Sequence, residues 1–164
     1  MRRATRTGLA CLTILALAPA VLAAQAPDNA DAREIAAFTL EDTALENWAV
    51  ALSSMNAAVA ADPSLAESIE LEADATLDDM VTAIESRDVL RGAIEDAGMD
   101  VREYTLFTIA LTQALFAEAI VSQGLAPEIP EGVNPANVEF VERNKARIEA
   151  LVRAGAAEED GSGN

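Results

Sequence analysis

Histidine is absent from the 164-residue sequence, and cysteine occurs once, at Cys11. Without histidine the chain cannot build a Ser-His-Asp or Cys-His catalytic unit, a histidine-ligated haem, or the Glu-x-x-His site of a di-iron helical bundle. The usual zinc sites need histidine or several cysteines, so they are excluded as well. We therefore expect no catalytic residue, no metal ligand and no cofactor from these classes.

Motifs for phosphate, dinucleotide and calcium binding are also missing. No segment carries a phosphate-binding loop or a dinucleotide-binding glycine pattern. The acid clusters EADATLDD and EDAGMD lack the spacing of an EF-hand loop. Aromatic residues make up only 4% of the sequence, which leaves few side chains for stacking on sugars. An enzyme that uses only carboxylates and tyrosine remains a minor alternative, with Glu118 as its general acid.

The first 24 residues have the features of a secretory signal peptide. Three arginines among the first six residues form a positive region, and Leu9–Ala18 is apolar but too short to span a bilayer. Small residues follow, with cleavage expected near Ala23 or Ala24. We predict export to the periplasm or the extracellular space. Cys11 lies within the signal, so the exported chain is expected to form no disulfide.

Acidic residues dominate the charge balance. The sequence has 28 acidic and 11 basic residues, a net charge of −17, and only one lysine, Lys145. Removal of residues 1–24 takes away three arginines, which gives a net charge of −20. Such a surface repels nucleic acid and anionic lipid, so we expect no nucleic-acid partner. The charge fits either attraction of a basic partner or cations or, as favoured, the solubility of an exported protein.

Helical periodicity runs through the rest of the chain, and no segment alternates like a half-buried strand. A capping box at Thr39–Asp42 precedes apolar residues at helical spacing, which predicts a helix ending near Ala61. The apolar residues of this helix are Leu45, Trp48, Leu52, Met55 and Val59. Further helix starts are predicted at Ser64, Thr76, Ser86, Asp100 and Asn134, with helix-ending glycines at Gly98 and Gly124. Residues predicted to point inward include Val89 and Leu90, and Val138, Val141, Ile148, Leu151 and Val152 in a last helix that ends near Arg153.

These elements predict an all-α, single-domain bundle of about four main helices plus one or two short helices. The helical domain is expected over residues 34–154. Residues 25–33 are expected to form a flexible leader, and residues 155–164 a disordered acidic tail.

Tyr104–Val121 is the most apolar stretch beyond the signal, and its eighteen residues are at the lower limit for a bilayer span. Gln113 and Glu118 lie within it, and an acid in hydrocarbon is costly. A helix that is apolar nearly all round is surrounded by either protein or lipid. Because amphipathic helices precede and follow it, we expect a folded core and no membrane insertion after signal cleavage.

Several polar residues on the predicted helices have two interpretations. Thr105, Thr108 and Thr112 form a stripe that either lines a ligand pocket or bonds to backbone carbonyls one turn back, and the second is favoured. Glu118 is either a buried general acid or, as favoured, lies partly exposed or pairs with an arginine. Asn144 either fixes helix register from a buried position or, as favoured, lies at the boundary of the core.

Trp48, Tyr104 and Phe107 are the candidate ligand-binding residues. They lie on apolar stripes of two predicted helices, and a pocket between these stripes would suit a small apolar ligand. The favoured interpretation of Trp48, however, is that a lone tryptophan on such a stripe belongs to the core.

The segments AGMDVREYTLFTIALTQALFAEAI (Ala97–Ile120) and PEGVNPANVEFVERNKARIEAL (Pro130–Leu151) resemble a pattern in small secreted helical bacterial proteins without a known activity. The resemblance covers the C-terminal half of the exported chain. It implies a bacterial envelope location and a helical fold, and it assigns no catalytic residue.

The leading functional hypothesis is a non-enzymatic, soluble interaction or binding module of the bacterial envelope. Its partner is an unknown protein. The alternative is a carrier of a small apolar ligand within the helical bundle.

Overall fold

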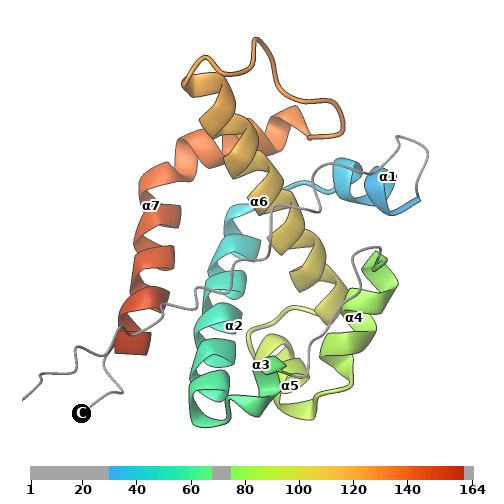
Figure 1. The fold of residues 1–164 in the computed structure, drawn as a ribbon, viewed down its shortest axis with the longest axis vertical. Helices are drawn as coiled ribbons and strands as arrows, with labels where there is room; N and C mark the ends of the chain where they lie inside the picture. The colour runs from blue at the N-terminus through green and yellow to red at the C-terminus, as the bar shows by residue number, and fades with distance from the viewer. Residues whose placement is uncertain (1–29, 68–74, 161–164) are drawn as a thin grey trace, which may run out of the picture.

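The computed structural model describes residues 30–67 and 75–160 (Figure 1). Within these ranges the chain forms helices and no strands, so the predicted all-α fold is confirmed, although the helices are somewhat more numerous than expected. The predicted signal peptide, residues 1–24, lies outside the described residues. The helices are α1 (Ala30–Ala37), α2 (Asp42–Ala61), α3 (Ser64–Glu67), α4 (Leu77–Glu85), α5 (Asp88–Asp96), α6 (Val101–Ser122) and α7 (Pro135–Asp160).

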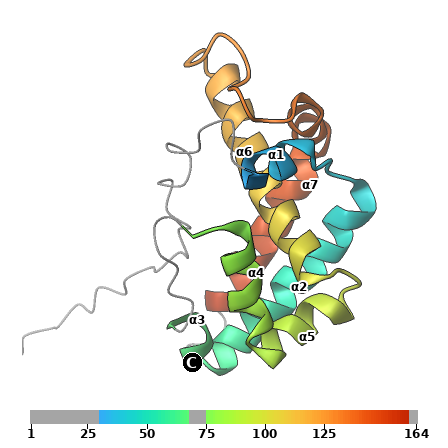
Figure 2. The same ribbon diagram turned by 90° about the vertical axis from the view of Figure 1, so that its right-hand side faces the viewer.

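Helix α6 is the centre of the arrangement. It packs against α1, α2, α4, α5 and α7, and α2 packs in turn against α5 and α7. Figures 1 and 2 show α4 and α5 near the N-terminal end of α6, while the opposite end leads into the long connection to α7. The most apolar segment of the sequence therefore crosses the middle of the fold.

Local sequence signals place several helix ends as predicted. Thr76 and Asp79 form a reciprocal capping box at the start of α4. The Asp100 side chain accepts a hydrogen bond from the Glu103 backbone N–H at the start of α6. Asn134 accepts a hydrogen bond from the Ala136 N–H, and Pro135 is the first residue of α7.

Glycine conformation ends two helices as predicted. Gly98 has a φ of 86° and Gly124 a φ of 70°, in the left-handed region that side chains with a Cβ rarely adopt. The chain can therefore reverse between α5 and α6, and again after α6, without backbone strain.

Three predicted N-caps are wrong. Glu41, not Thr39, precedes α2 and makes no side-chain cap, because the chain just before it is held by contacts to α7 described below. Helix α3 begins at Ser64 as predicted, but Ser64 does not cap it, because the Asp62 carboxylate accepts hydrogen bonds from the Ser64 N–H and hydroxyl. Ser86 ends α4, and its hydroxyl donates back to the Ala83 carbonyl.

The two ends of the described domain also differ from the prediction. Helix α1 begins at Ala30, inside the stretch expected to be a flexible leader, because Ile35 is buried against Leu77 and Leu106. Helix α7 continues to Asp160 instead of ending near Arg153. Alanine and glutamate in this last stretch have high intrinsic helix propensity, which allows the helix to continue. Residues 25–29 and 161–164 lie outside the described residues.

The core combines large side chains from α2, α5, α6 and α7. Predicted inward residues that are buried include Leu45, Trp48, Leu90, Ile94, Val138, Val141 and Ile148. Leu52, Met55 and Leu151 are partly buried and pack against this core. Val89 and Val152 are exposed in the described structure, so their predicted inward orientation is wrong. Helical spacing therefore identifies the apolar side of a helix, but it does not show which residues at the border of that side are buried.

Helix α6 is the one helix in the described ranges that is long and apolar enough to cross a membrane by length and composition alone. The core helix of a water-soluble protein meets the same description. Its N-terminal half buries large side chains such as Phe107 and Leu111, whereas Phe116 in its C-terminal half is exposed. The helix is thus enclosed by protein over only part of its length.

Candidate functional site

Two of the three predicted ligand-binding aromatics, Trp48 and Phe107, meet at the crossing of α2 and α6. The ring centroids of Trp48 and Phe107 are 5.8 Å apart, with an interplanar angle of 34°. Phe38, from the segment between α1 and α2, meets Phe107 edge-on at 6.5 Å. Phe107 is 0% exposed and Trp48 6% exposed. A ligand between Trp48 and Phe107 would therefore have to separate two rings that already pack on each other.

The polar group of Trp48 is also engaged within the fold. Its Nε1–H donates to the Thr108 hydroxyl at 2.9 Å, and that hydroxyl donates to the Tyr104 backbone carbonyl at 2.8 Å. Tyr104 is buried, and burial raises the pKa of its phenol to about 12. The phenol is therefore neutral near pH 7 and is not suited to act as a general base there.

The threonine stripe makes the favoured backbone bonds. Thr105 donates to the Val101 carbonyl at 2.7 Å, and Thr112 donates to the Thr108 carbonyl at 2.8 Å, as Thr108 does one turn earlier. Each hydroxyl is satisfied by the helix itself, which is how threonine is accommodated in an apolar helix. The bonds confirm this interpretation of the stripe.

Glu118 pairs across the α6–α7 interface with Lys145. The Lys145 Nζ lies 3.0 Å from Glu118 Oε1, and the Glu118 side chain is 12% exposed while that of Lys145 is 53% exposed. Glu118 is therefore partly exposed, as favoured, and its partner is the single lysine of the chain rather than an arginine. The hydrogen bond to Glu118 raises the pKa of Lys145. Glu118 therefore joins two helices at the edge of the core.

The two asparagines of α7 have opposite roles. Asn144 is half-buried and donates to the Phe140 carbonyl at 3.2 Å, which fits the boundary position. Asn137, which sequence reasoning missed, is buried; its Oδ1 accepts from the Leu40 N–H and its Nδ2 donates to the Phe38 carbonyl, both at 2.9 Å. Its position one turn before Val141, on the inward face, was the available signal.

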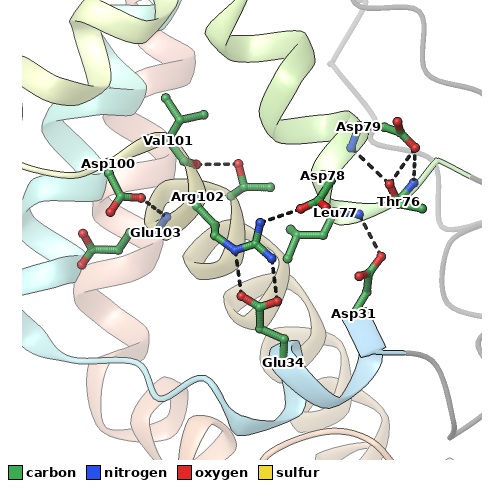
Figure 3. A network of polar contacts seen from close by, with 11 residues as sticks. Asp31, Glu34, Thr76, Leu77, Asp78, Asp79, Asp100, Val101, Arg102 and Glu103 are labelled. Atoms are coloured by element: carbon green, nitrogen blue, oxygen red, sulfur yellow. Dashed lines mark hydrogen bonds and ion pairs between the residues drawn. The ribbon is translucent and has the colours of Figure 1, made fainter.

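A second polar cluster was also missed, and it joins three helices (Figure 3). Arg102 of α6 makes two parallel hydrogen bonds to Glu34 of α1, with Nε–Oε1 at 2.8 Å and Nη2–Oε2 at 2.7 Å. Its Nη1 donates to Asp78 of α4 at 2.7 Å. Nearby, the Asp31 carboxylate accepts from the Leu77 N–H at 2.9 Å. The hydrogen bond from Arg102 lowers the pKa of Glu34. The cluster fixes α1 against α4 and α6.

In residues 30–67 and 75–160, no group of three or more aspartate, glutamate, histidine or cysteine side chains is placed to hold a metal ion. In the same ranges every buried side-chain nitrogen or oxygen has a hydrogen-bond partner. The polar groups inside the described fold therefore hold helices together, and the groups left for contact with other molecules lie on the surface.

No protein-family model, characterised protein or solved structure matches this chain. Inference about its function therefore starts from its own residues.

Proposed function

We propose that this chain is an exported, soluble helical protein of the bacterial envelope that acts by binding a partner rather than by catalysis. The observation that supports this most is that the side chains considered for catalysis are already engaged within the fold. Tyr104 is buried, Glu118 is paired with Lys145, and the Thr108 hydroxyl is bonded on both sides. Side chains engaged in this way stabilise the helical fold. Contact with another molecule is then left to the surface of the protein.

The surface charge favours a basic partner. The cations of α5 and α6, and three of the four in α7, already lie in ion pairs, such as Arg91 with Asp88 and Arg147 with Glu46. Acidic residues exceed basic ones by 17 in the whole sequence, so much negative charge is left uncompensated. A negative surface attracts a cationic partner and increases its association rate at low ionic strength.

Export is part of this proposal and rests on the pattern of residues 1–24. Mass spectrometry of the protein from the periplasmic fraction or culture medium should give a chain that begins near Gln25. Retention of the intact N-terminus in the cytoplasmic fraction would contradict export.

Partner binding can be tested by capture from an envelope extract with the tagged, processed protein, at low salt and at high salt. We expect a stoichiometric partner whose retention falls as salt rises, because screening weakens contacts between exposed charges. Recovery of the chain alone at both salt concentrations would count against the proposal.

The carrier alternative stays a prediction for Trp48, Tyr104 and Phe107. It requires the ring contact between Trp48 and Phe107 to open around a ligand. Native mass spectrometry of the protein from its host, together with Trp48 fluorescence on addition of fatty acids, distinguishes the two functions. A clean unliganded mass and an unchanged spectrum would remove the carrier.

A further inference from the structure

The C-terminal end of α6 presents large apolar side chains to solvent. Phe116 is 47% exposed and Leu125, just after the helix, is 73% exposed. Ile120 lies one turn after Phe116, and residues four apart are neighbours on a helix surface. Two of the largest exposed apolar side chains of the described protein therefore flank Ile120, which is partly buried.

Backbone geometry brings Leu125 next to Ile120. The Leu125 N–H donates to the Ile120 carbonyl at 2.8 Å, and the Gly124 N–H donates to the Val121 carbonyl at 2.9 Å. With Gly124 at a φ of 70°, these bonds form a Schellman motif, in which the residue after the glycine folds back toward the last helical turn. We call Phe116, Ile120 and Leu125 the α6-end patch.

The patch continues a stripe that is covered elsewhere along α6. Ile109, Phe116 and Ile120 lie within about 40° of one another around the helix. Ile109 packs with Ile35 of α1, whereas the stripe beyond it is exposed at Phe116. Figures 1 and 2 both show the C-terminal end of α6 extending past α1. The patch is thus the more exposed end of a stripe that is partly covered at Ile109.

The electrostatic surroundings of the patch are negative. It lies at the C-terminal end of a 22-residue helix, where the helix dipole places partial negative charge, and the last turn has no basic residue. Glu128 and Glu131 are exposed in the connection that follows. Lys145 forms an ion pair with Glu118, and Glu118 lies about 200° around the helix from Phe116, on a different side from the patch. An apolar surface with a negative border suits an apolar ligand that also carries positive charge.

We propose that the α6-end patch docks a cationic amphipathic helix of a partner protein. Apolar side chains of that helix would cover Phe116, Ile120 and Leu125, and its lysines or arginines would face the end of α6, Glu128 and Glu131. The proposal rests on the proposed function and names the partner's chemistry. A second copy of the processed chain would bring together two molecules with a net charge of −20 each, and anionic lipid is repelled for the same reason.

The first experiment measures binding of a labelled synthetic leucine–lysine amphipathic helix to the processed protein by fluorescence anisotropy. The controls are a leucine–glutamate peptide with the same pattern and a leucine–lysine peptide of scrambled order. We expect the cationic amphipathic peptide to bind about tenfold or more tightly than either control, because the site requires both charge and a continuous apolar face. Equal affinity for the leucine–glutamate peptide, or no binding of the cationic peptide, would overturn the proposal.

The second experiment locates the peptide with matched variants. The double variant Phe116→Ser, Leu125→Ser should weaken binding about tenfold or more, since burial of these side chains is lost. The control Val89→Ser, Val152→Ser removes two exposed apolar side chains outside the patch and should change affinity by less than about twofold. Circular dichroism and thermal melts verify that each variant is folded. Equal losses in both variants would overturn the location.

The charge contribution has its own matched pair. Glu128→Gln with Glu131→Gln should weaken binding by about two- to tenfold at low salt and by less at high salt. Glu85→Gln with Asp96→Asn removes the same charge from α4 and α5, near the other end of α6, and should have a smaller effect (Figure 1). If the two pairs have the same effect, the peptide senses only the overall charge and the docking site is wrong.

Two further outcomes identify other occupants and reject this one. Light scattering that shows a dimer lost in Phe116→Ser, Leu125→Ser would assign the patch to a second copy of the chain. Phe116-dependent binding to phosphatidylcholine vesicles, without peptide binding, would assign it to a lipid surface. If capture from envelope extract yields a partner that this double variant retains, the proposed function stands and the docking site fails.

Discussion

The two halves of α6 are similarly apolar, but the fold treats them differently. From Val101 to Leu111 the helix buries large side chains, including Tyr104, Leu106 and Phe107. From Thr112 to Ser122 its buried residues are alanines, Ala114 and Ala117. The N-terminal half is an enclosed core element, and the C-terminal half is covered on the side of Ala114 and Ala117, with Leu115 partly buried against the core.

The difference arises from the neighbours of each half. The N-terminal half meets α1 and α4 through Arg102 and meets α2 through Trp48 and Thr108. The C-terminal half meets α7, where Glu118 pairs with Lys145. Small side chains such as Ala114 allow close approach of a packed helix, so this side is covered while Phe116 remains exposed. The apolar composition of a helix therefore does not by itself show whether other helices cover it.

The comparison predicts very different effects for two substitutions of phenylalanine on the same helix. Phe107→Ala should lower the free energy of unfolding by about 3–5 kcal/mol, because it leaves a cavity at a fully buried position between Trp48 and Phe38. Phe116→Ala should lower it by less than about 1 kcal/mol. Urea unfolding followed by Trp48 fluorescence and circular dichroism measures both. Similar losses in the two variants would contradict the division of α6.

Helix α7 offers the same test with asparagine. Asn137→Ala should cost about 2–3 kcal/mol, because the buried Leu40 N–H loses its acceptor and the Phe38 carbonyl loses one of its donors. Asn144→Ala removes a single half-buried bond and should cost under about 1 kcal/mol. Urea unfolding again measures the difference. A larger loss of stability in Asn144→Ala than in Asn137→Ala would instead support the interpretation that Asn144 fixes helix register.

Two threonines give a smaller contrast within α6. Thr108→Val removes the acceptor of the buried Trp48 indole N–H and should cost about 1–2 kcal/mol. Thr112→Val removes the same kind of backbone bond at an exposed position and should change stability by about 0.5 kcal/mol or less. The Trp48 emission maximum should shift in the first variant only. No shift in Thr108→Val would mean that the Trp48 environment does not depend on the Thr108 hydroxyl.

The sequence predicted features that depend on neighbouring residues along the chain. The capping box at Thr76, the proline after Asn134 and the left-handed glycines Gly98 and Gly124 act within one turn of a helix, so their signals are local. The all-α class follows from the same local patterns. These signals do not depend on which helices later become neighbours.

Features that depend on distant residues were not predictable in the same way. Arg102 and Glu34 are 68 residues apart, and Asn137 and Leu40 are 97 residues apart. The exposed side of α6 at Phe116 is likewise set by where α1 ends in space rather than by the spacing of apolar residues in α6. The aromatic residues predicted as a ligand site were grouped correctly in part, since Trp48 and Phe107 do meet, although each packs on the other.

Tyr104 tests the difference between the two halves of α6 at alkaline pH, because this single tyrosine of the chain lies in the N-terminal half. Burial raises the pKa of its phenol from 10 to about 12, since the charged phenolate is disfavoured in the core. The pKa of Tyr104 is thus higher in the folded than in the unfolded chain, and the folded state buries the neutral phenol. Ionisation therefore leaves stability unchanged below about pH 10 and lowers it progressively between about pH 10 and 12.

Tyrosinate absorbance should therefore rise near pH 12 in the folded protein and near pH 10 in urea. Tyr104→Phe should remove the absorbance step and reduce the alkaline loss of stability. A midpoint near pH 10 with helical circular dichroism intact would show that the N-terminal half of α6 is open to water, and the contrast between the two halves would be lost.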